Sequence, residues 1–187
     1  MKVILPKQVG KEDGKVLFLK SEPVKDLKEA EEIVKILKET MKYYGGVGLA
    51  APQVGILKRV FVINIESNER YSQKIPNIGF KAYINPKILE CSLETNIDLE
   101  GCLSVFYATL YGKVERPNYL KIKYLDLEGK EKTEKTIHPF QTRVILHEND
   151  HLDGIIFLQR MKKEDFSDLI WEEKFDIRKR TKNSPPS

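Results

Sequence analysis

The apolar residues between Lys25 and Tyr44 recur at the three- and four-residue spacing of an amphipathic helix. This spacing predicts a helix over residues 25–44 with one face turned toward the core. We interpret that face as packing and not as a cofactor site. Its members are Leu27, Ala30, Ile33, Val34, Leu37 and Met41.

Shorter runs further along the chain predict β-strands. Residues 59–65 are rich in β-branched side chains, which is typical of a short buried strand. Pro86 divides two further predicted strands at 82–85 and 88–99. Residues 119–126 alternate between apolar and polar positions, and the turn that follows predicts a return strand at 132–137.

The last third of the chain predicts two more helices, at residues 140–153 and 162–180. The second is highly charged and is expected to turn Phe166, Leu169, Ile170 and Phe175 toward the body. Because strands precede a late central helix and no repeat interrupts them, we expect one α+β domain over residues 1–187. The segments expected to be irregular are 1–22 (loops or a short hairpin), 66–79 (a surface loop) and 181–187 (a disordered tail).

Composition narrows the class of protein. The chain has 187 residues with 41% hydrophobic and 32% charged side chains, as expected for a globular domain. A net charge of +4 is too small to predict nucleic-acid binding by itself. The longest apolar run, residues 60–65, is far too short to span a membrane, and the first residues do not form a signal peptide. We therefore expect a cytoplasmic protein with no membrane partner.

The most informative motif is His147-Glu148-Asn149-Asp150-His151, an H-E-x-x-H pattern. On a helix the two histidines lie on one face and can bind one metal ion, with Glu148 beside them as a base. Two exposed histidines would give the same pattern by chance, so the motif alone leaves both interpretations open.

The segment Glu100-Gly101-Cys102-Leu103-Ser104 offers a third ligand. The chain has only two cysteines, which predicts a reducing compartment and no disulfide framework. We expect Cys91 to be a small buried apolar residue. Cys102 follows a glycine, which allows close backbone approach, and could complete a His, His and Cys site with a fourth position open.

A third segment, residues 45–53, is rich in glycine and alanine and ends in Gln53. It lacks the Lys and Ser/Thr of a phosphate-binding loop. The amide of Gln53 is suited to hold a developing oxyanion. A flexible connector after the first helix is the alternative interpretation.

Together, GVGLAAPQ, EGCLS and HENDHLDG resemble, in this order, the three motifs of the peptide deformylases. The resemblance extends from about Ser21 to about Met161. It implies antiparallel sheets around a central metal-binding helix, with a C-terminal helix. It also implies removal of the formyl group from N-terminal formylmethionine of newly made polypeptides, with release of formate.

The resemblance assigns roles to individual residues. It implies that Cys102, His147 and His151 bind one divalent metal, with Fe(II) favoured and Zn, Ni or Co compatible with sulfur and imidazole ligands. Glu148 is then the general base. The Gln53 side chain and the Leu103 backbone N–H meet the oxyanion. For the peptide, Val47 and Gly48 offer backbone and Val144 helps to wall the methionine pocket, while Glu100 and Arg116 are expected to form a supporting ion pair.

Some positions depart from the family pattern. Phe106 stands where proline is common, Leu146 stands where glutamine is common, and residues 106–112 form a stretch about two residues longer than expected. These departures affect the rim of the site and the substrate preference. Outside the motifs, we expect His138 to be structural and Asp150 to pair with Arg143 or Arg116.

Two alternatives remain. The first is a zinc peptidase in which Glu172 or Glu173 is the third ligand, and the second is a binding protein that keeps the deformylase fold without activity. The expected partners are N-formylmethionyl nascent peptides and, through a basic C-terminal helix, the ribosome. That helix carries Lys174, Arg178, Lys179, Arg180 and Lys182.

Overall fold

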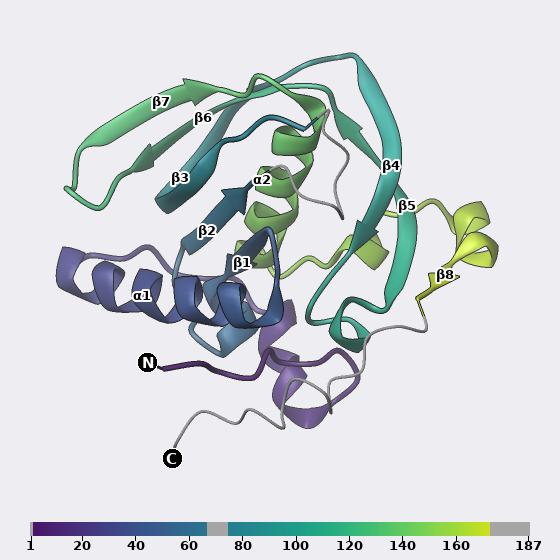
Figure 1. Cartoon of the computed structure of the whole chain (residues 1–187), viewed down its shortest axis with the longest axis horizontal. Helices are drawn as coiled ribbons and strands as arrows, with labels where there is room; N and C mark the ends of the chain where they lie inside the picture. The colour runs from purple at the N-terminus through teal and green to yellow at the C-terminus, as the bar shows by residue number, and fades with distance from the viewer. Residues whose placement is uncertain (1, 67–74, 173–187) are drawn as a thin grey trace.

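The computed structural model describes residues 2–66 and 75–172 and has an α+β architecture (Figure 1). A five-stranded sheet has the order β1-β2-β3-β6-β7, and a three-stranded sheet has the order β4-β5-β8. Every strand pair is antiparallel. The strands are β1 (Gly48–Ala50), β2 (Val60–Ile65), β3 (Gly79–Cys91), β4 (Thr95–Gly101), β5 (Leu110–Pro117), β6 (Leu120–Leu125), β7 (Glu131–Lys135) and β8 (Ile170–Trp171).

Helix α1 (Leu27–Tyr44) ends where the sequence predicts and begins two residues later than predicted. The Asp26 side chain accepts a hydrogen bond from the Lys28 backbone N–H, and Gly45 ends the helix in the left-handed conformation with φ of 67°. Five of the six apolar residues predicted for its buried face lie in the core, where the helix packs against β1 and β2, and Leu37 is fully buried. The sixth, Leu27 at the start of the helix, is exposed, which corrects that part of the prediction.

Helix α2 (Pro139–Leu152) lies at the centre of the molecule, between the two sheets (Figure 1). It packs against β1 and β2 on one side and against β5 on the other. Ile145 and Leu152 are fully buried in the cluster beneath the five-stranded sheet. The predicted α+β class, with antiparallel sheets around a central helix, is therefore confirmed.

Strand β3 corrects one prediction, because it passes through Pro86 without ending there. The pairing with β6 shifts its register between Ile84 and Lys87, which forms a bulge at the proline. A bulge needs no ladder hydrogen bond from the residue that it leaves unpaired, so the missing N–H of proline is tolerated there. The predicted strand at 88–99 is instead divided at residues 92–94, where the chain turns from β3 into β4.

Other segments also differ from their predictions. Residues Glu12–Phe18 form a 3₁₀ helix where loops or a hairpin were expected. The predicted helix at 162–180 is wrong over its described part, which forms a short 3₁₀ helix, Lys163–Asp168, and then β8. Strand β5 was not predicted. The predicted tail and the basic residues beyond Glu172 lie outside the described residues.

Strand β8 explains why the predicted helix at 162–180 does not form over its described residues. Ile170 pairs with Tyr111 and Trp171 pairs with Leu110, so the backbone bonds of this segment go to a sheet edge. A helix over the same residues would leave that edge uncovered. In the described part of the chain, no helix is long and apolar enough to cross a membrane.

Candidate active site

Helix α2 carries the H-E-x-x-H residues on its last turns. His138 caps the helix by accepting a hydrogen bond from the Phe140 backbone N–H at its Nδ1 (3.1 Å), which confirms its structural role. Pro139 occupies the first helical position, where no N–H is needed. His147 and His151 are one turn apart, and their ring centroids lie 5.1 Å from each other.

Cys102 lies directly after β4 and points toward these histidines. Its Sγ is 3.2 Å from Nε2 of His151, and both residues are buried. One potential ligand atom from each of Cys102, His147 and His151 lies within 4.8 Å of the others. The sequence placed these residues in two separate motifs, and the fold brings them together.

The donor set fits a divalent metal ion. Thiolate sulfur and imidazole nitrogen are ligands that zinc and other late first-row metals accept in four-coordinate sites. Burial lowers the pKa of His151 well below 6.5, so its ring is neutral and offers a lone pair. Burial also opposes charge on His147, but hydrogen bonds with Cys102 and Glu100 hold its pKa well above 6.5. The surroundings of His147, with Cys102 and Glu100 beside it, therefore favour a positive charge.

Glu148 lies beside this cluster with its carboxylate buried. Burial raises the pKa of Glu148 to about 7. Among the described residues, no hydrogen-bond partner reaches its Oε2. A Cβ at position 48 would collide with the Glu148 carboxylate, so the space next to β1 exists only because Gly48 has no side chain.

Gln53 is held in one orientation next to Cys102. Its Oε1 accepts a hydrogen bond from the Ala50 backbone N–H (2.8 Å). Its Nε2 therefore faces the site and donates to Cys102 Sγ (3.4 Å) and Ser104 Oγ (3.3 Å). The segment 45–53, expected as a loop, contains β1 and a 3₁₀ helix, Ala51–Val54, which fixes this side chain.

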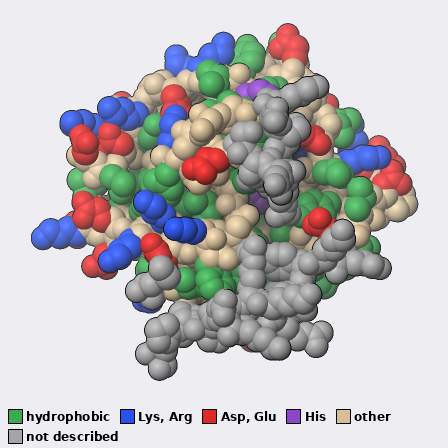
Figure 2. Space-filling view, viewed as in Figure 1, with side chains coloured by type: hydrophobic (Ala, Val, Ile, Leu, Met, Phe, Trp, Pro, Cys, Tyr) green, Lys and Arg blue, Asp and Glu red, His purple; other side chains and the backbone are tan. Residues whose placement is uncertain are grey.

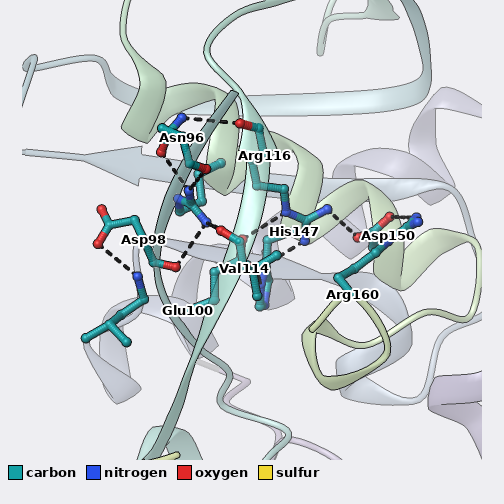
Figure 3. A network of polar contacts seen from close by, with 10 residues as sticks. Asn96, Asp98, Glu100, Val114, Arg116, His147, Asp150 and Arg160 are labelled. Atoms are coloured by element: carbon teal, nitrogen blue, oxygen red, sulfur yellow. Dashed lines mark hydrogen bonds and ion pairs between the residues drawn. The ribbon is translucent and has the colours of Figure 1, made fainter. Parts of the chain in front are cut away.

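A buried network of ion pairs contacts His147 on the Nδ1 side of its ring (Figure 3). Glu100 accepts two hydrogen bonds from Arg116, at 2.9 and 3.1 Å, so the predicted ion pair is present. Its Oε2 also lies 2.9 Å from Nδ1 of His147. Burial opposes charge on Glu100, but His147 and Arg116 outweigh it and hold the pKa of Glu100 well below its usual value.

Two more arginines complete the network. Arg116 also donates a hydrogen bond from its Nη1 to Asp150 (2.7 Å), so Arg116, of the two candidates from the sequence, is the partner of Asp150. Arg143 instead donates to Glu100 (3.0 Å) and to the Val114 carbonyl (2.7 Å). Arg160 reaches Asp150 from the exposed side at 2.6 Å. The sequence offered Arg143 only as a possible partner of Asp150, and no pattern indicated the roles of Arg160 and Ser104.

The site opens into a cavity of about 560 Å³. The expected peptide-contacting residues Val47, Gly48 and Val144 all line it, together with Glu148. Other residues named from the motifs also reach it: Gln53, Glu100, Cys102, Leu103 and His147. The far wall includes residues that sequence reasoning missed, namely Tyr44, Tyr111, Ile170 and Trp171.

The zinc-peptidase alternative is not supported. Glu172 lies at the rim of the cavity, where its Oε2 accepts a hydrogen bond from the Tyr111 hydroxyl (3.0 Å). The cluster of potential metal ligands found in the described residues comprises Cys102, His147 and His151. Glu173 lies outside the described residues.

An α+β fold with an H-E-x-x-H helix facing a buried cysteine defines a class of metal-dependent hydrolases. The sequence profile described as "Polypeptide deformylase" matches residues 6–167, and the chain belongs to this family. Members of the family are enzymes that remove the formyl group from N-terminal methionine, so the chain is placed among the deformylating hydrolases.

Individual relatives agree with this assignment. A peptide deformylase of Thermotoga neapolitana is 39% identical over 148 residues, which are 79% of this chain and 82% of the relative. Peptide deformylase 2 of Clostridium perfringens is 38% identical and covers 83% and 91% of the two chains. A Met-Ala-Ser-bound class I type b peptide deformylase of Acinetobacter baumannii is 36% identical, with a TM-score of 0.77 over 86% of this chain and 100% of that one.

Proposed function

We propose that this chain deformylates N-formylmethionyl peptides with Cys102, His147 and His151 as the ligands of one divalent metal ion. The observation that supports the proposal is the convergence of these three side chains beside the buried Glu148, on the wall of a cavity. A structural metal site has no use for a buried base at that point.

Fe(II) is the metal that we propose, and Zn, Ni or Co would suit the same sulfur and imidazole ligands. When bound, such an ion lowers the pKa of coordinated water and polarises a carbonyl oxygen. Glu100 holds the Nδ1 side of His147 and so directs its Nε2 toward Cys102. Arg116 bonds both Glu100 and Asp150, and so it holds Glu100 in place against helix α2.

Glu148 is the proton carrier in this proposal. With a pKa of about 7, its carboxylate can accept a proton from the attacking water at neutral pH. The same carboxyl group then returns the proton to the leaving amine, and formate is released. Its buried position keeps bulk water away from the proton in transit.

Gln53 and Leu103 meet the negative charge that develops on the formyl oxygen. The Gln53 amide donates toward Cys102 because its oxygen is already held by Ala50. Leu103 directly follows Cys102. Its carbonyl oxygen accepts a hydrogen bond from Gln8 Nε2 (2.8 Å), which fixes the backbone that carries the Leu103 N–H. Donors that are fixed before the reaction stabilise an oxyanion without reorganisation.

The peptide is expected to bind as an extended strand at the edge of β1. Strand β1 lies at the end of its sheet and β4 lies at the end of the other, and both border the cavity. Val47 and Gly48 would supply backbone partners. Val144 and Phe140 would wall the methionine side chain, for which an apolar pocket is suited. The relative with bound Met-Ala-Ser supports this class of ligand.

The cellular setting follows from the substrate. An enzyme that acts on newly made polypeptides would work in the cytoplasm, and the basic residues at 174–182 would allow contact with ribosomal RNA. Those residues lie outside the described part of the chain. On the described part of the face in Figure 2, basic and acidic side chains are interleaved.

The test is formate release from formyl-Met-Ala-Ser, combined with metal analysis of purified protein. Cys102→Ser should lose the bound metal and the activity. Cys91→Ser should keep both, because Cys91 is exposed and not buried as the sequence suggested. His151→Asn should behave as Cys102→Ser, and His138→Asn should keep the metal. A metal-loaded protein that releases no formate would instead be a binding protein with the deformylase fold.

A further inference from the structure

The side chain of Gln8 is buried beneath the segment that follows Cys102 and does not line the cavity. Its Nε2 donates hydrogen bonds to the carbonyls of Leu103 (2.8 Å) and Pro6 (3.1 Å). Its Oε1 accepts a hydrogen bond from the Tyr107 N–H (3.3 Å). Both N–H groups of the amide and its oxygen are therefore used, and two of the three bonds go to the turn that follows Cys102.

The peptide unit that joins Cys102 to Leu103 is fixed through its carbonyl. The Cys102 oxygen accepts hydrogen bonds from the Val105 N–H (2.9 Å) and the Ala108 N–H (2.9 Å). Because a trans peptide is planar, its N–H points away from its carbonyl, so these bonds also set the direction of the Leu103 N–H. Among the described residues, none accepts a hydrogen bond from that N–H, which leaves it available to a ligand in the cavity that Leu103 lines.

The turn that supplies these bonds has a backbone conformation that needs outside support. Phe106, Tyr107 and Ala108 have φ angles of 46°, 55° and 60°. Residues with a side chain seldom adopt this left-handed region, and then usually as single residues. Such a conformation persists only where its surroundings determine it. The stretch 106–112 also departs in length from the family pattern, so we looked for its support among contacts particular to this chain.

The segment around Gln8 is anchored to the backbone of both proposed oxyanion donors. The Lys7 N–H donates to the Gln53 carbonyl (2.8 Å), and the Val9 N–H donates to the Ser104 carbonyl (2.9 Å). These two bonds hold the N-terminal segment between the 3₁₀ helix that carries Gln53 and the turn after Cys102. The amide of Gln8 is thereby placed where it reaches the middle of the turn.

We propose that Gln8 is a positioning residue that keeps the Leu103 N–H aimed at the formyl oxygen. It acts through the turn, by holding the Leu103 carbonyl and the Tyr107 N–H, and does not touch the substrate. This inference rests on the proposed function, which places the developing negative charge at Gln53 and Leu103. An oxyanion donor is effective only when it is fixed before the reaction, and a misplacement of about 1 Å can cost about 10²-fold in rate.

The first test is Gln8→Met, which keeps the length of the side chain and removes its amide. In metal-loaded full-length protein acting on formyl-Met-Ala-Ser, kcat should fall by about 10- to 100-fold. That loss is smaller than the cost of removing an oxyanion donor outright, which is about 10²–10³-fold. KM and metal content should change by less than about 2-fold, because the peptide contacts and the metal ligands are unaltered.

Thr40→Val is the matched control. Thr40 is fully buried in α1, and its Oγ1 accepts a hydrogen bond from the Ile4 N–H (3.1 Å). It therefore anchors the same N-terminal segment at a point away from the turn. This variant should also be destabilised in thermal denaturation, but it should keep the wild-type kcat at a temperature where it is folded. A Gln8 that served only the stability of the fold would give the same result as Thr40.

A second variant and a second measurement guard against poor folding of Gln8→Met. Gln8→Glu keeps the shape and the acceptor for the Tyr107 N–H but, as a carboxylate, has no donor for the Leu103 carbonyl, so its kcat should also fall. Amide hydrogen exchange of residues 102–108, measured without substrate, should be faster in Gln8→Met than in the wild type and unchanged in Thr40→Val. This measurement needs no turnover.

A wild-type kcat in both Gln8 variants would overturn the inference, and so would a loss of kcat that Thr40→Val shares. An effect confined to KM, or unchanged exchange in residues 102–108, would also contradict it. A metal-loaded wild type that releases no formate would contradict the proposed function instead. Hydrogen exchange would then still decide whether Gln8 orders the turn.

Discussion

The carboxylate of Glu148 fills the space that a side chain at Gly48 would need. Strand β1 and helix α2 thus meet at a glycine and a buried acid, and neither residue can be changed without effect on the other. This contact links the GVGLAAPQ segment to the H-E-x-x-H helix.

Gly48→Ala should therefore destabilise the fold by roughly 1–3 kcal/mol, because an added methyl group in a packed region forces its neighbours to move. In a Glu148→Ala background the same substitution should cost less than about 1 kcal/mol, since the colliding carboxylate is gone. Chemical denaturation of the four proteins in the cycle gives the coupling. Equal costs in both backgrounds would show that the contact is absent.

Glu148→Gln should retain the metal and lose activity by about 10²–10⁴-fold, the usual contribution of a positioned acid–base group. The amide has nearly the shape of the carboxyl group and cannot carry the proton. Metal content and the rate of formate release are measured on the same preparation. Turnover close to that of the wild type would remove Glu148 from the proton path.

Arg116 bridges two buried carboxylates, Glu100 and Asp150, and its side chain is only 6% exposed. Arg116→Met should lower the free energy of unfolding by about 3–5 kcal/mol, because two buried charges lose their partner. Arg160→Met removes a 43%-exposed partner of Asp150 and should cost about 1 kcal/mol or less. Similar costs for both variants would argue against the buried network as the support of His147.

Ala108→Gly should stabilise the protein by about 1 kcal/mol. Ala108 has a φ of 60°, and a left-handed residue with a Cβ costs roughly 1–2 kcal/mol, part of which the greater freedom of glycine in the unfolded chain offsets. Thermal denaturation measures the effect. Ala30→Gly, at a buried position near the start of α1, is the control and should destabilise.

The stability of the fold should decrease at alkaline pH through Tyr83. Burial and the neighbouring Glu134 raise the pKa of Tyr83 well above 10.0, and its hydroxyl donates to Glu134 at 2.7 Å. The folded state keeps this proton while the unfolded state loses it, so the contribution is complete below pH 10 and declines as the pH rises. Tyr83→Phe should make the alkaline slope shallower by up to about 1.4 kcal/mol per pH unit. Parallel curves for the two proteins would contradict this.

Local patterns in the sequence were enough for features that depend on near neighbours. The stripe in α1, the buried strand β2 and the placing of His147, Glu148 and His151 on one helix all follow from residues a few positions apart. The order of the three motifs also indicated the family. These features can be predicted from the sequence because helix and strand periodicity is a property of the local backbone.

Only the tertiary structure gives the contacts between distant residues, of which the family resemblance had indicated just the grouping of Cys102 with the two histidines and the pair of Glu100 with Arg116. It brought Cys102 to 3.2 Å from His151, placed Gly48 against Glu148 and turned the charged segment after Lys162 into a strand on β5. Pro86 was accommodated because β3 bulges at the proline where it pairs with β6. Pairing between strands depends on partners far apart in the chain, and no local pattern records which edge a segment will join or which side chain will leave room for another.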